Sequence, residues 1–150
     1  MDKLIFLERG LGDVVQVDVY YNSFLQSRYQ HTKSSLIQNG SFVEEVWVFH
    51  STPQRNIESI MTRGFLIGGI EVPIVNGQSY GPGIYTSKNP IIAMRYASDN
   101  RVMVLSKGLI QTDKSVTMGI GQRRPLNVEE VVIFTDGRLL LPQYIIHYIG

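Results

Sequence analysis

Four residues in this sequence combine a chemically useful side chain with a place at the boundary of an apolar segment. His50 ends the apolar run EVWVFH, Tyr85 lies in YGPGIYTS, and Glu129 and Glu130 directly precede the run VVIF. An imidazole can accept or donate a hydrogen bond, an aromatic ring can hold a flat ligand, and a carboxylate can stabilise developing positive charge. Taken singly, none of these residues identifies a function.

Each of them also has an ordinary structural explanation. A lone histidine at the end of a buried strand is most often a hydrogen-bonded residue at the edge of the core. The glycines of YGPGIYTS suit a tight turn, and a Gly-x-Gly that opens no helix is not a dinucleotide-binding fingerprint. Tyr96 would share a helix face with Ile92 and Ala93, which favours packing. Of the two neighbouring glutamates, only one can share a face with a given strand residue.

The composition excludes several other kinds of chemistry. The chain has 150 residues, 18% of them charged, and a net charge of +1, which suits a single domain over 1–150 and does not call for a polyanionic partner. It has no cysteine, so thiolate catalysis, disulfides and cysteine metal sites are excluded. The three histidines, His31, His50 and His147, are widely spaced, and we expect no metal site. The N-terminal run LIFL is too short for a signal peptide or membrane helix, so we expect a cytoplasmic or nuclear location.

The strands that must position these side chains follow from the apolar pattern. Val15, Val17, Val19 and Tyr21 alternate with polar residues and predict a strand with this set on its buried face. Continuous apolar runs predict strands that are buried on both faces. The predicted strand segments are 13–21, 45–50, the end of 80–87, 101–110, 130–134 and 142–149.

Three helices are predicted between the strands. The first covers 23–38 and stops at Asn39-Gly40. The second begins at Thr52-Pro53, an N-cap followed by proline, and Gly64 closes it. The third begins at Asn89-Pro90 and continues to about residue 98. Strands outnumber helices and their connections vary, which indicates an α+β fold built on antiparallel strands.

In their order along the chain, these motifs resemble the catalytic domain of the poly(ADP-ribose) polymerase (PARP) family, which carries a His-Tyr-Glu triad. His50 in HST matches the family's His-Gly-Thr or His-Gly-Ser, and Tyr85 in GPGIY matches its Gly-x-Gly-x-Tyr. Glu130 in EEVVIF matches the glutamate that heads a late strand, with Glu129 as the rival for that role. Asn56 and the closing segment PQYIIHY also match, so the resemblance covers nearly the whole chain.

The resemblance implies an ADP-ribosyltransferase fold, with an antiparallel split β-sheet and flanking helices, and NAD as the substrate without a metal. Glu130 would bond the 2′-hydroxyl of the nicotinamide ribose and stabilise its oxocarbenium-like transition state. Tyr85 and Tyr96 would hold the nicotinamide ring, and the backbone of Ser51 would bond the carboxamide.

Further binding positions follow from the same resemblance. His50 would bond the adenosine ribose, with Thr52 close by and Asn56 at a position where the family has asparagine. The chain departs from the family at two of these positions, with Ser51 in place of a glycine and Ala93 in place of a serine that bonds the carboxamide oxygen.

The resemblance therefore implies an enzyme that transfers ADP-ribose. Because the chain has no room for a regulatory helical domain and the segment 106–128 is short, we expect transfer of single units. The expected acceptor is a protein, with the enzyme itself as one candidate, or a nucleic-acid end. Two alternatives stay open: an inactive module that binds NAD, ADP-ribose or a protein partner, and an RNA 2′-phosphotransferase, for which only pairs such as Arg123-Arg124 speak.

Overall fold

A computed structural model describes residues 13–67, 82–95, 101–111, 122–123 and 131–149 of the chain. In this part of the chain one seven-stranded sheet forms the centre, with strand order β1-β7-β4-β2-β3-β6-β5 and antiparallel pairing throughout. The strands are β1 (Asp13–Val19), β2 (Val43–Ser51), β3 (Ile84–Ser87), β4 (Val102–Gln111), β5 (Gln122–Arg123), β6 (Val131–Phe134) and β7 (Leu140–Ile149). The predicted α+β class on antiparallel strands is confirmed.

The sheet has a narrow junction between its two parts. β2 pairs with β4 along its whole length, from Val43 to Ser51. Among the described residues, a single pair, Phe49 with Ser87, joins β2 to β3. This junction is where the predicted splitting of the sheet occurs, and His50 follows it directly.

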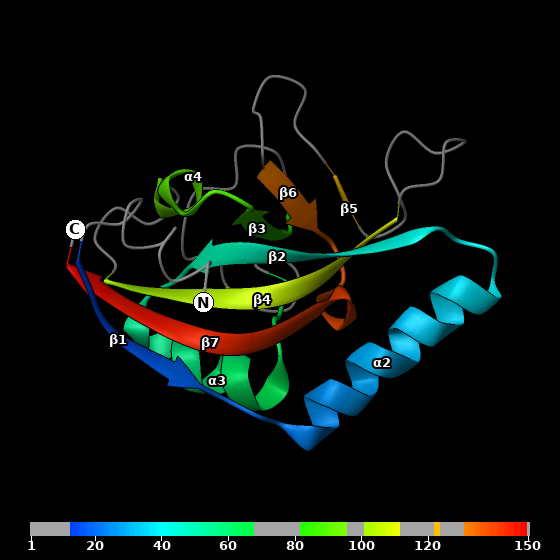
Figure 1. Cartoon of the computed structure of the whole chain (residues 1–150), viewed down its shortest axis with the longest axis horizontal. Helices are drawn as coiled ribbons and strands as arrows, with labels where there is room; N and C mark the ends of the chain where they lie inside the picture. Colours follow the sequence, from blue (N-terminus) through cyan, green and yellow to red (C-terminus); the bar gives the residue numbers. More distant parts are fainter. Residues whose placement is uncertain (1–12, 68–81, 96–100, 112–121, 124–130, 150) are drawn as a thin grey trace.

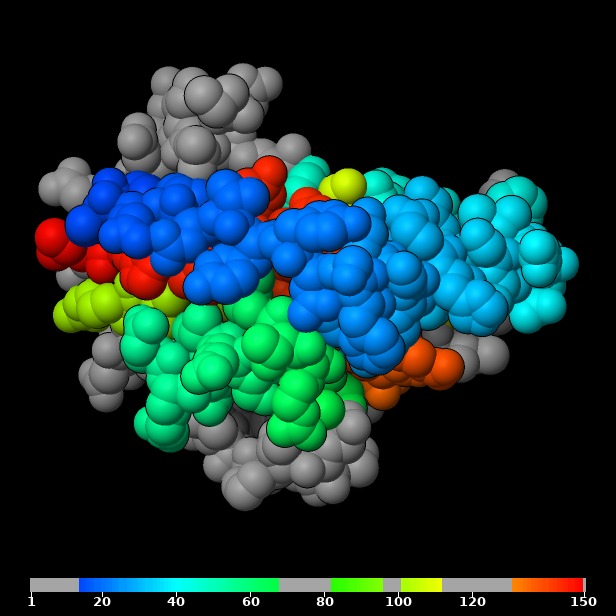
Figure 2. Space-filling view, turned by 90° about the horizontal axis from the view of Figure 1, so that it is seen from below, coloured from blue at the N-terminus to red at the C-terminus, as the bar shows by residue number. Residues whose placement is uncertain are grey.

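Helices cover both faces of the sheet (Figure 1). On one face lie α2 (Ser23–Gln38), the short 3-10 helix η1 (Gln54–Asn56) and α3 (Ile57–Arg63). Figure 2 shows this face, with α2 and α3 side by side. On the other face lies α4 (Pro90–Met94). A further 3-10 helix, η2 (Gly137–Leu139), precedes β7.

The two larger of three apolar clusters fill the spaces between these layers. We call them the α3-side cluster and the α4-side cluster, after the helix that packs on each. The α3-side cluster includes Leu25, Tyr29, Val48, Ile60, Phe65, Val104 and Phe134. The α4-side cluster consists of Phe49, Ala93, Met103, Leu105, Ile146 and Tyr148.

The prediction for the helix at 23–38 is confirmed. The Asn22 side chain accepts a hydrogen bond from the Leu25 backbone N–H at 3.1 Å, which caps the first turn. Its amide group also donates to the carbonyls of Met61 and Thr62, at 3.1 and 3.2 Å, and so ties α2 to the end of α3. At the other end, Gly40 has a φ of +86°, which other residues rarely adopt.

The predicted inward face of the first strand is wrong for Val15, Val19 and Tyr21, whereas Val17 is partly buried against the α4-side cluster. Val15, Val19 and Tyr21 are 60%, 73% and 77% exposed. The pairing with β7 shifts between Val14 and Gln16, so a bulge at Val15 removes that residue from the ladder and breaks the alternation. β1 is also an edge strand that ends at Val19, which leaves Tyr21 beyond the strand.

The predicted start of the second helix is also wrong. Pro53 holds the N-cap position, without a side-chain cap, and the chain first forms η1 before α3 begins at Ile57. Thr52 is not a cap: its hydroxyl accepts a hydrogen bond from the Asn56 side chain at 3.3 Å. Asn89 does cap α4, since its side chain accepts from the Ile91 N–H at 2.9 Å.

Candidate functional site

His50 bridges the two parts of the sheet directly beside their single paired position. Its Nδ1 lies 2.8 Å from the backbone carbonyl oxygen of Tyr85, on β3. The ring also contacts Phe65 at a centroid distance of 5.1 Å and an interplanar angle of 84°. Two of the three predicted triad residues, His50 and Tyr85, are therefore in contact.

This contact determines what the imidazole can do. A carbonyl oxygen only accepts, so Nδ1 must carry the proton and donate it. The imidazole is half-buried, and burial lowers the pKa of His50 below its ordinary value, although the hydrogen bond to Tyr85 raises it in part. The ring is therefore neutral at pH 7, and Nε2 is left as an acceptor suited to a ligand hydroxyl.

A pH-dependence of stability follows from the lowered pKa of His50. Because the pKa is lower in the folded state than the ordinary value of 6.5, the unfolded state binds more protons between these two values. The free energy of unfolding should therefore decrease as the pH falls through 6.5 and level off below the folded-state pKa. Urea unfolding at about pH 7.5 and about pH 5.0 measures this decrease.

The matched variants for this measurement are His50→Gln and His31→Gln. The first should lower stability at neutral pH, by loss of the imidazole contacts, and weaken the decrease between the two pH values. His31 is exposed on α2, and its replacement should leave the decrease as it is. The carboxyl groups of Asp18 and Asp136 have pKa values below 3.8, lowered mainly by hydrogen bonds from Gln16 and Arg138, so their stabilisation is lost only in more acidic solution. An equal decrease in all three proteins would contradict the assignment to His50.

His50 and Ser51 point to opposite faces of the sheet, because side chains alternate along β2. His50 lies opposite Val104, a member of the α3-side cluster. Ser51 lies opposite Met103, a member of the α4-side cluster. The two side chains therefore lie on opposite faces of the sheet, His50 on the face of Phe65 and Ser51 on the face of α4.

The Ser51 hydroxyl is a buried polar group that lacks a hydrogen-bond partner in the described part of the chain. The residue is 3% exposed, and its Oγ has no hydrogen-bond partner of acceptable geometry among the described residues. The Tyr148 hydroxyl lies near enough for Ser51 to offset part of the rise that burial causes in the pKa of Tyr148. The two hydroxyl groups approach each other without forming a full hydrogen bond.

Replacing Ser51 with alanine should therefore stabilise the free protein. A buried hydroxyl without a partner costs about 1–3 kcal/mol, and its removal should raise the free energy of unfolding by about 0.5–2 kcal/mol. Ser106→Ala is the matched control, since Ser106 is also buried on β4 with an Oγ that lacks a partner in the described part of the chain. Both variants should gain stability in urea unfolding; a loss in Ser51→Ala alone would show that the hydroxyl is satisfied.

The remaining predicted residues divide into two groups. Tyr85 is buried and packs with Val131 and Ile133 of β6, with Ile92 of α4 against them. Ala93, also on α4, is 1% exposed within the α4-side cluster.

The second group is not described. Tyr96, Glu129 and Glu130 lie outside the described residues, although β6 begins at Val131, the residue after Glu130. Val131 pairs with Ser87 of β3, which is the residue that also pairs with β2. The strand that follows Glu130 in the sequence is therefore attached at the narrow junction.

Two residues beside the site were not predicted from the sequence. Phe65 follows the predicted second helix and Tyr148 lies in the predicted strand 142–149, but neither was assigned to the site. Their ring and hydroxyl reach His50 and Ser51 from distant parts of the chain. No local spacing signals such contacts, since both depend on how the sheet and helices pack.

The described residues contain neither a cluster of metal ligands nor a membrane-spanning helix. No group of three or more histidine, cysteine, aspartate or glutamate side chains in these residues could hold a metal ion. None of the helices in the described segments is long and apolar enough to cross a membrane.

Comparison with known proteins identifies the family. The family model of the poly(ADP-ribose) polymerase catalytic domain matches residues 11–112. The chain therefore belongs to the PARP catalytic-domain family, and the family predicted from the sequence is confirmed. No curated protein sequence matches the chain significantly.

Solved structures show the same fold. The PARP domain of Arabidopsis RADICAL-INDUCED CELL DEATH1 has a TM-score of 0.68 at 16% identity, over 97% of this chain and 95% of that chain. The TASOR pseudo-PARP domain has a TM-score of 0.66 at 13% identity, over 99% of this chain and 93% of that chain. At these identities the likeness concerns the fold alone.

Proposed function

We propose that this chain is an NAD-dependent ADP-ribosyltransferase that transfers single ADP-ribose units. The observation that carries the proposal is the hydrogen bond between His50 Nδ1 and the Tyr85 carbonyl, 2.8 Å long. It joins two residues of the triad in a chain of the PARP family and leaves His50 Nε2 as an acceptor. A neutral acceptor suits a ribose hydroxyl, which can donate to it.

The reaction breaks the bond between nicotinamide and C1′ of its ribose. Nicotinamide leaves with the electron pair of that bond, the ribose becomes oxocarbenium-like, and the acceptor attacks C1′ and releases its proton. Glu130 stabilises the positive charge through the ribose 2′-hydroxyl and polarises the acceptor. Tyr85 and Tyr96 hold the nicotinamide ring, and the Ser51 backbone bonds its carboxamide.

The adenosine side of NAD lies beside His50, on the face of the sheet that this side chain occupies. His50 Nε2 accepts from the adenosine ribose, and the hydrogen-bonded pair of Thr52 and Asn56 lies next along the chain. The acceptor is a protein, and the enzyme itself is the first candidate to examine. Single-unit transfer follows from the short segment 106–128, which leaves an acceptor ADP-ribose little surface to rest on.

Two measurements on one reaction test the proposal. The protein is incubated with NAD, nicotinamide release is followed by chromatography, and the intact protein is weighed by mass spectrometry. We expect free nicotinamide together with mass increments of single ADP-ribose units. A ladder of long polymer would refute single-unit transfer, and the absence of nicotinamide release with every acceptor tried would refute the activity itself.

The second candidate is a module that binds without catalysis. Ser51 and Ala93 favour it, because they replace a glycine and a hydrogen-bonding serine of the family pattern. The TASOR pseudo-PARP domain also has this fold. A module of this kind would show thermal stabilisation by NAD or ADP-ribose and no release of nicotinamide.

Ala93→Ser tests the placement of the nicotinamide subsite. If Ala93 faces the carboxamide, the serine restores one neutral hydrogen bond of about 0.5–1.5 kcal/mol, so affinity should rise about 2- to 12-fold. Calorimetric titration should show this gain for NAD and for benzamide, which both carry the carboxamide, and none for ADP-ribose, which lacks it.

The alternative for Ala93 has a different signature. The residue is buried beside Phe49 and Met103, so a serine that meets no ligand would bury an unpaired hydroxyl and lower stability. Unchanged or weaker benzamide binding, together with a lower melting temperature, would remove Ala93 and Tyr96 from the proposed subsite.

A further inference from the structure

Phe65 stands out among the residues that the proposed reaction does not use. It is 4% exposed, it follows α3 by two residues, and its ring meets the His50 imidazole nearly at a right angle. Together with the Tyr85 carbonyl, it supplies the second contact that defines the plane of the imidazole. A ring in this position limits rotation of the histidine side chain.

The backbone around Phe65 is held from two sides. Gly64 has φ 82° and ψ 178°, a conformation that is essentially restricted to glycine. Gly137 of η2 lies directly against Phe65, since a Cβ on Gly137 would be 2.2 Å from the Phe65 carbonyl oxygen. Gly137 has no positive φ, so its requirement for glycine comes from the close approach.

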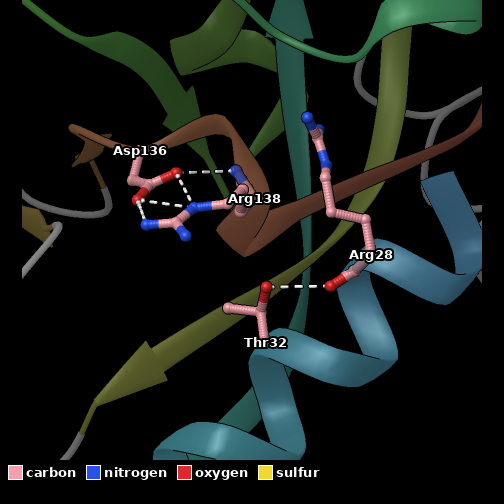
Figure 3. Close-up of polar contacts among 4 residues, drawn as sticks. All are labelled: Arg28, Thr32, Asp136 and Arg138. Carbon is pink, nitrogen blue, oxygen red and sulfur yellow. Dashed lines mark hydrogen bonds and ion pairs between the residues drawn. The ribbon is translucent and has the colours of Figure 1, made fainter.

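Figure 3 shows the side chains of Arg28 on α2 and of Asp136 and Arg138 at the start of η2. The Asp136 carboxylate accepts from the Arg138 backbone N–H at 2.9 Å and from its guanidinium at 2.6 Å, which fixes the start of η2. From α2, the Arg28 side chain extends to Gly64, where its Nη2 would lie 2.3 Å from an added Cβ. Gly64 and Phe65 therefore lie between α2, which contacts Gly64 through Arg28, and η2, which contacts Phe65 through Gly137.

We propose that Phe65 is a positioning residue that sets the orientation of the His50 imidazole, and that Gly137 in turn sets the position of Phe65. The effect of this positioning on NAD binding rests on the proposed function, in which His50 Nε2 accepts a hydrogen bond from the adenosine ribose. The orientation itself is a property of the free protein and can be measured without a ligand.

The physical reason is that the hydrogen bond to Tyr85 selects one tautomer only while the ring keeps its plane. Rotation of the ring moves Nδ1 away from the carbonyl, and the proton preference between Nδ1 and Nε2 is lost. A leucine at position 65 leaves space beside the imidazole, because it lacks the flat edge that the phenyl ring presents. The proportion of Nε2 that is available as an acceptor then falls.

The test is the imidazole ¹⁵N spectrum of His50 in Phe65→Leu. The wild type should show the Nδ1-protonated tautomer, and the variant should show a mixture, with the tautomer ratio reduced about 2- to 12-fold by the loss of one hydrogen bond. Phe134→Leu is the matched control: Phe134 is fully buried in the same cluster and forms no ring contact with His50 within the described segments. A ratio that is unchanged in Phe65→Leu, or equally changed in both variants, would overturn the proposal.

Gly137→Ala tests the second link of the arrangement. The added methyl group cannot fit against the Phe65 carbonyl, so the backbone of Phe65 must shift, and the His50 spectrum should change in the same direction as in Phe65→Leu. If these variants fail to fold, the nuclear Overhauser contact between the His50 and Phe65 rings in the wild type remains decisive. Its absence would overturn the proposal.

Kinetics separate this proposal from the proposed function. If the wild type releases nicotinamide, Phe65→Leu should raise KM for NAD about 2- to 12-fold and change kcat by less than about 2-fold, because the histidine contributes to binding. Phe134→Leu should leave KM of its folded fraction unchanged. If the wild type releases none, the activity fails, while the tautomer measurement still judges the role of Phe65. An unchanged KM in an active Phe65→Leu enzyme would contradict the positioning role.

Discussion

Replacing Glu130 with glutamine should lower turnover about 100-fold or more, while NAD still binds. The amide keeps the shape and part of the hydrogen bonding of the carboxylate, but it removes the negative charge that faces the oxocarbenium-like ribose. Because this charge matters mainly in the transition state, the loss should fall on kcat and leave the affinity for NAD nearly unchanged. Nicotinamide release under saturating NAD measures the first quantity, and calorimetry measures the second.

Glu129→Gln is the matched control for this prediction. The proposed function assigns the ribose contact to Glu130, with Glu129 as the rival for that role. We expect Glu129→Gln to keep most of the activity. The reverse outcome, an active Glu130→Gln and an inactive Glu129→Gln, would move the catalytic role to Glu129.

Replacing Gly64 with alanine should lower the free energy of unfolding by about 2–4 kcal/mol. The backbone conformation of Gly64 excludes side chains, and an added Cβ would also meet Arg28 Nη2 at 2.3 Å and Leu25 Cδ2 at 3.2 Å. Urea unfolding measures the loss. Since Gly64 precedes Phe65, the surviving folded protein should also show a disturbed His50 spectrum.

Gly40→Ala separates backbone strain from crowding. Gly40 also has a positive φ, of +86°, but a Cβ there would meet no atom within 4 Å. Its replacement should cost only the backbone term, about 1–2 kcal/mol. Equal losses in the two variants would mean that the contacts of Gly64 with α2 contribute nothing.

Local signals in the sequence were sufficient for much of the fold. The stop at Asn39-Gly40 predicted the end of α2, and the predicted range 23–38 agrees with its observed bounds. The closing Gly64 and the cap at Asn89 were also predicted. These signals act over a few residues, through hydrogen bonds and dihedral angles that the neighbouring chain determines.

The errors arose where a neighbouring strand or a competing residue decided the outcome. Alternation in β1 could not reveal the bulge at Val15, because a bulge is defined by the register with β7. The sequence predicted Thr52 as a helix N-cap. The backbone of Pro53 is extended, so the helical segment begins after it, and the Thr52 hydroxyl instead accepts a hydrogen bond from the Asn56 side chain.

For the candidate site, motif order was sufficient to pair His50 with Tyr85, which the structure brings into contact. Motif order could not show which face each side chain of HST occupies, nor which residue stands beside the imidazole. Phe65 reaches His50 only because Gly137, in a segment far along the chain, lets its backbone approach. Such a contact depends on tertiary packing and has no local signal.

The single pair between β2 and β3 has a consequence for local unfolding. The ladder from β2 through β4 to β7 is long, whereas β3 and β6 are joined to it, among the described residues, by Phe49 and Ser87. Segments with few shared hydrogen bonds open as separate cooperative units at lower free energy. Amide protons of β3 and β6 should therefore exchange with deuterium before those of β4. A ligand that contacts both sides of the junction would slow this exchange, because it would couple the opening of β3 and β6 to the opening of the ladder from β2 to β7.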